Sequence, residues 1–75
     1  MQEQIFEALR RGAHGEALAA ARAAVEADPR GARPQLWLAM ALSADGRRDE
    51  ALAAIDRAIA LAPQDADLHF HRAGF

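Results

Sequence analysis

The sequence predicts an all-α protein of about five helices, built from antiparallel helix-turn-helix repeats. The first observation behind this prediction is an internal period of 34 residues. Residues 12–31, laid over residues 46–65, pair Gly12 with Gly46, Glu16 with Glu50, Leu18 with Leu52 and Pro29 with Pro63. Four alanines coincide as well, although this Ala-rich chain makes them weak evidence. Periods of this length are typical of helical repeat proteins.

The second observation is the position of glycine and proline within that period. Gly12 and Gly46 permit the tight turn that ends a first helix, and Pro29 and Pro63 prevent a second helix from continuing. Asp65 has the side chain of a helix N-cap. No strand pattern competes, so we expect helices near residues 3–11, 15–27, 34–44, 48–61 and 66–73.

The third observation is apolar spacing in the second helix of each period. Three- and four-residue steps place one set of side chains on one face of each helix. The sets are Ala17, Leu18, Ala21, Ala24 and Val25 in the first period, and Ala51, Leu52, Ile55, Ala58 and Ile59 in the second.

With glycine and proline at these positions, the chain resembles the tetratricopeptide repeat family over nearly its whole length. The single predicted domain, residues 1–75, then divides into a degenerate repeat at 1–31, a complete repeat at 32–65 and a partial repeat at 66–75. The central unit carries the family pattern at Leu38, Ala39, Leu42, Gly46, Ala51, Ile55, Ala58 and Pro63. The pattern is broken at Gln35, where an aromatic residue is common, and at Gln4, where a leucine is expected.

The resemblance implies a concave groove that receives a peptide or a partner protein. The positions carried over for partner binding are Phe6, Leu9, Arg10, Arg33, Leu36, Trp37, Met40, Phe70 and His71, with Ser43, Ala44 and Asp67 beside them. Leu36, Trp37 and Met40 form one stripe at three- and four-residue spacing, displaced from the core face of Leu38, Ala39 and Leu42. The alternative is that Trp37 and Met40 are simply core residues.

The end of the sequence suggests a second interpretation. Residues 66–75 correspond to the first half of a third repeat, so Leu68 and Phe75 are expected to lack a covering helix. About three repeats are normally needed for a stable array. We therefore keep as the alternative function a homo-oligomerisation element, stacked or domain-swapped, of a larger protein with no separate ligand.

Composition argues against other classes of function. Nine basic and eleven acidic residues are interspersed, so no basic patch predicts nucleic acid as a partner. The chain has no Cys, Lys or Tyr, and Ser43 is its only hydroxyl side chain, so we predict no enzyme activity and no cofactor. His69 and His71 are two apart, which directs them to different sides of a helix, and we predict no metal site.

Two further expectations concern the surroundings of the protein. No signal peptide and no membrane-spanning apolar run are visible, so we expect a soluble, cytoplasmic chain without membrane insertion. Family members that bind chaperones grip a terminal carboxylate with Lys and Asn, and both residue types are missing here.

Overall fold

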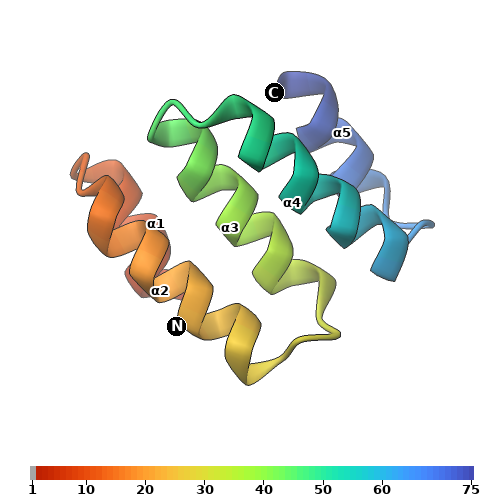
Figure 1. The fold of residues 1–75 in the computed structure, drawn as a ribbon, viewed down its shortest axis with the longest axis horizontal. Helices are drawn as coiled ribbons and strands as arrows, with labels where there is room; N and C mark the ends of the chain where they lie inside the picture. The colour runs from red at the N-terminus through yellow and green to blue at the C-terminus, as the bar shows by residue number, and fades with distance from the viewer. Residues whose placement is uncertain (1) are drawn as a thin grey trace.

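The computed structural model describes residues 2–75 and contains five α-helices within them (Figure 1). They are α1 (Gln2–Arg10), α2 (His14–Ala27), α3 (Ala32–Ala44), α4 (Arg48–Leu61) and α5 (Ala66–Gly74). Met1, included in the predicted first repeat, lies outside the described residues. The predicted all-α class and helix order are confirmed. Helix α3 begins two residues earlier than predicted, because Pro34 falls in its first turn, where a missing N–H costs no helical hydrogen bond.

The two glycine turns have the same geometry. Gly12 and Gly46 have φ angles of 76° and 80°, in the left-handed region. After Gly12, the N–H of Ala13 donates a hydrogen bond to the carbonyl of Ala8 at 2.8 Å. After Gly46, the N–H of Arg47 donates to the carbonyl of Leu42 at 2.9 Å. This pairing is the Schellman motif that satisfies the last carbonyls of a helix. The 34-residue period is therefore a period of backbone structure as well as of sequence.

The other junctions lie where the proline residues predict them. Helix α2 ends before Asp28-Pro29 and α4 ends before Ala62-Pro63. The predicted N-cap at Asp65 is confirmed, since its Oδ1 accepts a hydrogen bond from the backbone N–H of Asp67 at 3.0 Å. Gly31, which precedes α3 at the corresponding position, has no side chain with which to cap.

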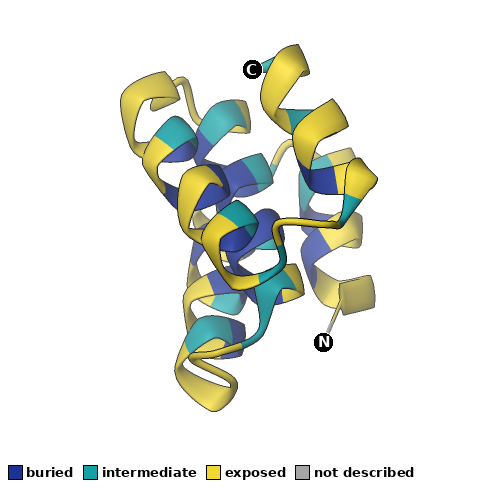
Figure 2. Ribbon diagram, turned by 90° about the vertical axis from the view of Figure 1, so that its right-hand side faces the viewer, coloured by how far each residue is buried: buried dark blue, intermediate teal, exposed yellow. Residues whose placement is uncertain are grey.

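Helix α3 lies at the centre of the molecule. Figure 1 shows it between α2 and α4, and α3 also contacts α1. Seen from the side in Figure 2, α1 and α5 lie in a second layer, and buried positions occur where the layers meet. Much of the core is alanine, which lets helices approach closely: Ala17, Ala21, Ala39, Ala51, Ala54 and Ala58 are all 0% exposed.

Two expectations about burial are wrong. Leu36 is only 2% exposed and belongs to the core rather than to a stripe beside it. Leu68 is 0% exposed, because α5 packs on α4 and brings this side chain into the same cluster. Phe75 is partly buried against that cluster as well. Contact with α4 is therefore enough to bury Leu68.

Gln35, which breaks the family pattern, is buried in the structure. It is 7% exposed, and its Oε1 accepts no hydrogen bond. A buried carbonyl oxygen without a donor lowers the stability of the fold. The aromatic position of α3 is therefore filled by a polar side chain at an energetic cost.

A candidate partner-binding face

Trp37 and Met40 lie on a side of α3 that is only partly covered. Both are partly buried and pack against the core, so each is accessible from one side. Trp37 and Met40 were interpreted either as partner-binding residues or as core residues, and each side chain has one side that fits each interpretation. Leu36, predicted to join them, is enclosed and can only support the surface from beneath.

Aromatic side chains from α1 and α5 lie on the helices of the second layer. Phe6 is 39% exposed and Phe70 is 76% exposed, which are large exposures for phenylalanine. Leu9 is partly buried against the core. His71 lies edge-on to Phe70, with 6.0 Å between ring centroids and 76° between ring planes. We use the term "α3 face" for the partly exposed side of α3 formed by Trp37 and Met40.

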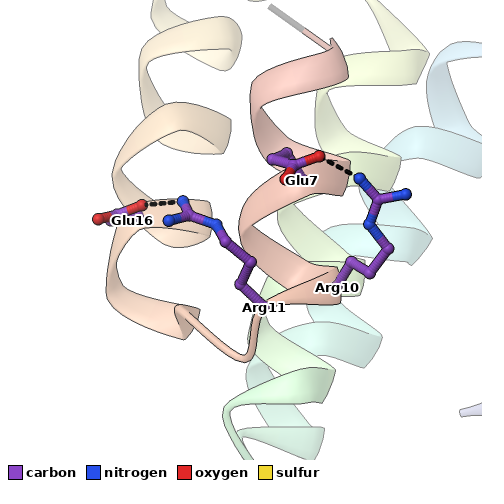
Figure 3. A network of polar contacts seen from close by, with 4 residues as sticks. All are labelled: Glu7, Arg10, Arg11 and Glu16. Carbon is purple, nitrogen blue, oxygen red and sulfur yellow. Dashed lines mark hydrogen bonds and ion pairs between the residues drawn. The ribbon is translucent and has the colours of Figure 1, made fainter.

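The basic residues predicted at this face are already paired within the chain. Figure 3 shows Arg10 bound to Glu7, and the neighbouring Arg11 bound to Glu16 at 2.7 Å. Arg33 has its Nη2 at 3.4 Å from Asp67 Oδ2 and at 3.5 Å from Asp65 Oδ2. These internal carboxylates neutralise the arginines, so the face has no strong preference for an acidic ligand.

Four of the predicted site residues line two separate shallow recesses. One of about 310 Å³ on α1 is lined by Glu3, Phe6, Glu7 and Arg10. Another of about 390 Å³ at the end of α5 is lined by Phe70, His71, Ala73, Gly74 and Phe75. Neither recess includes a residue of α3. The structure thus brings Phe6 together with Arg10, and Phe70 together with His71, at opposite ends of the chain.

Sequence reasoning missed one exposed apolar residue. Leu61, the last residue of α4, is 42% exposed. It follows Ile59 by two residues, which turns it away from the apolar stripe of that helix. That spacing, together with Pro63 just beyond, is the signal that could have identified it.

Groups able to support catalysis or metal binding are sparse. Within residues 2–75 there is no cluster of three or more His, Asp or Glu side chains that could hold a metal ion. His69 is engaged with the backbone, its Nε2 donating to the carbonyl of Pro63 at 3.0 Å. None of the helices over this part of the chain has the length and apolar character needed to cross a membrane.

Helix pairs repeated at 34 residues, with matching glycine turns and proline ends, define a helical repeat protein. A family model described as tetratricopeptide repeat matches residues 8–70, and the chain belongs to this family. Comparisons with curated proteins and with solved structures gave no match. Tetratricopeptide repeats generally mediate interactions between proteins, and they are typically non-catalytic.

Proposed function

We propose that this chain is a protein-protein interaction module that holds an apolar segment of a partner protein on its α3 face. The observation that carries the proposal is the state of Trp37, which is anchored in the core on one side and accessible on the other. Tryptophan held in this way is common at interface hot spots, where its truncation often costs about 2 kcal/mol or more.

Two features of the surroundings support an apolar partner. Met40 lies three residues from Trp37 and adds a flexible apolar contact that adapts to different partner shapes. Arg10 and Arg33, the two cations predicted for the partner-binding surface, are paired with Glu7, Asp65 and Asp67. An acidic partner would have to displace these carboxylates, whereas an apolar one would leave them in place.

The proposal can be tested with the chain's own fluorescence, because Trp37 is its single tryptophan. The wild-type protein is titrated with amphipathic helical peptides that carry one leucine-rich stripe and no tryptophan. Binding at the α3 face is expected to shift the Trp37 emission to shorter wavelength. Scrambled peptides of the same composition, which have no continuous stripe, serve as controls.

Variants then locate the contact. With a labelled peptide as the reporter, Met40→Ala is expected to weaken binding several-fold, whereas Leu61→Ala, at an exposed leucine outside the face, leaves it unchanged. Equal effects of the two substitutions, or saturable binding with no change in Trp37 emission, would count against the proposed face.

The second candidate is self-association through α5. The observation that favours it is the large exposure of Phe70 beside a recess that Phe75 helps to line. A second copy that covers Phe70 would remove this apolar ring from water. Sedimentation over a concentration series is expected to show a rising average mass for the wild type and none for Phe70→Ser. A strict monomer at the highest concentration would exclude this candidate.

A further inference from the structure

A recess of about 260 Å³ lies among α2, α3 and α4. It is lined by Arg22, Leu38, Leu42, Glu50, Ala53 and Arg57. The three helices that form it run side by side in Figure 1, whereas α1 and α5 contribute no residue to it. We call it the outer recess.

The outer recess and the α3 face lie on opposite sides of one helix. Leu38 lines the recess and Met40 belongs to the face, and two residues of an α-helix correspond to a rotation of about 200°. A ligand in the recess therefore makes no contact with the α3 face. The site is distinct from the surface invoked in the proposed function.

The floor of the recess is apolar and its rim is charged. Leu42 is 4% exposed and Leu38 is partly buried, so both offer hydrocarbon at the bottom. Ala53 on α4 is too small to cover these leucines. Arg22 stands on the α2 side, and Arg57 on the α4 side. A ligand that inserts an apolar group meets a cation on each flank.

The rim arginines differ from the arginines elsewhere because they have no carboxylate partner. Ion pairs within residues 2–75 engage Arg10, Arg11, Arg33, Arg47 and Arg72, and they leave Arg22, Arg30, Arg48 and Arg57 without one. Two of these four unpaired arginines thus border the same recess. Its one carboxylate, Glu50, is directed to Arg47, whose Nη1 lies 3.6 Å from Glu50 Oε2.

We propose that the outer recess binds an acidic peptide segment in which one apolar side chain is flanked by carboxylates. The apolar side chain would rest on Leu38 and Leu42, and the carboxylates would pair with Arg22 and Arg57. The volume is smaller than the roughly 300–1,000 Å³ of small-molecule sites and suits a single side chain. Arginine binds a carboxylate through two parallel hydrogen bonds, so the contact has a specific geometry in addition to its favourable charge.

The same charges do not favour a nucleic acid. A polyphosphate chain is held by many neutralised phosphates along a basic track. The outer recess offers two unpaired arginines separated by an apolar floor, on a chain whose formal net charge is -2. An oligonucleotide has no aliphatic side chain to bury against Leu38 and Leu42.

The test uses a short fluorescent peptide with a central leucine and two acidic residues on each side. Its affinity for the full chain is measured by fluorescence anisotropy at low salt. One control peptide replaces the leucine with serine, and the other replaces the acidic residues with their amides. Both are expected to bind more weakly, and binding of the first peptide is expected to weaken as salt screens the ion pairs.

Variants of the protein locate the contact. Arg22→Gln and Arg57→Gln are each expected to weaken binding by about twofold to fivefold, as loss of an exposed ion pair does. Arg48→Gln is the matched control, because Arg48 also lies on α4, is exposed and unpaired, and does not line the recess. An equal loss for Arg48→Gln and Arg57→Gln would overturn the proposal, as would tighter binding of an oligonucleotide than of the peptide.

Nuclear magnetic resonance separates this site from the α3 face. The acidic peptide is expected to shift the methyl signals of Leu38 and Leu42 and to leave the indole N–H of Trp37 unchanged. The opposite pattern would overturn the outer recess and support the α3 face instead. Failure of the leucine-rich peptides to bind Trp37 would leave the outer recess unaffected, so the two proposals fail separately.

Discussion

Arg33 and Asp67 occupy the same position in consecutive 34-residue periods, and their side chains form an ion pair, with 3.4 Å between Arg33 Nη2 and Asp67 Oδ2. The pair joins the first turn of α3 to the first turn of α5, two helices with few other contacts. Asp65, which caps α5, lies 3.5 Å from the same arginine nitrogen. One arginine therefore ties the central helix to both acidic residues at the start of the last one.

A double-mutant cycle with Arg33→Gln and Asp67→Asn measures this link. Because both side chains are more than half exposed, we expect a coupling free energy of only about 0.2–1 kcal/mol in urea unfolding. The coupling should decline in 1 M salt, where the screening length is about 3 Å. A control cycle with Arg30→Gln should show none. Coupling that is insensitive to salt would contradict an ionic link.

The positive φ angles predict opposite effects of one substitution at two glycines. Gly46→Ala should destabilise the chain by about 1–2 kcal/mol, because a side chain disfavours the left-handed conformation. Gly15→Ala, inside α2, should stabilise it by about 0.4–1 kcal/mol through the unfolded state. No atom within 4 Å would clash with the added methyl group at either site. Thermal unfolding measures both, and effects of the same sign would refute the backbone explanation.

Removing the unpaired oxygen of Gln35 should stabilise the fold. Gln35→Leu keeps a side chain of similar size and eliminates a buried acceptor without a donor, so the free energy of unfolding is expected to rise by about 1 kcal/mol. Gln4→Leu, at an exposed position of α1, should stay within about 0.5 kcal/mol of the wild type. A loss of stability in Gln35→Leu alone would show that the amide makes a bond in solution.

The same substitution at a buried and at an exposed leucine should have different effects on stability. Leu36→Ala should cost about 2–5 kcal/mol, because it opens a cavity at a side chain only 2% exposed. The same substitution at Leu61, 42% exposed, should cost much less. Chemical unfolding followed by circular dichroism compares them. If Leu36→Ala unfolds no more easily than Leu61→Ala, α3 is oriented differently in solution.

The elements that sequence reasoning placed well depend on local chemistry. Gly12, Gly46, Pro29 and Pro63 determine their turns through their own backbone preferences, and Asp65 caps a helix within two residues of itself. Pairing of helices follows from the 34-residue period. These features needed no knowledge of how distant parts of the chain meet.

The burial of individual side chains depends on the rotation of each helix against its neighbours. Leu36 and Leu68 were expected outside the core, and both are enclosed. Leu68 stands where the preceding period has Pro34, and proline as a residue type did not predict that this position is buried in both periods. The start of a helix was also predicted inexactly, since α3 begins at Ala32 and not at residue 34.

The outer recess escaped notice for a related reason. Leu38 was interpreted as a filled core position, but the recess remains open because Ala53 is short. Residue type alone does not reveal such a space. The division into repeats at 1–31, 32–65 and 66–75, like the partner-binding roles and self-association, stays a prediction.

The matching turns at Gly12 and Gly46 have a consequence for protein engineering. Each turn closes with the same two backbone hydrogen bonds, because Gly12 and Gly46 also donate, to Leu9 and Ser43, at 3.1 Å. These bonds require no particular side chain at their donors and acceptors. A further copy of residues 32–65, inserted after Asp65, would start with Ala32 in the place of Ala66 and end at the native Asp65–Ala66 junction. Since each unit contacts mainly its neighbours, the extra unit would add one more interface of a known kind. The molecule could thus be lengthened in steps of 34 residues without redesign of any turn.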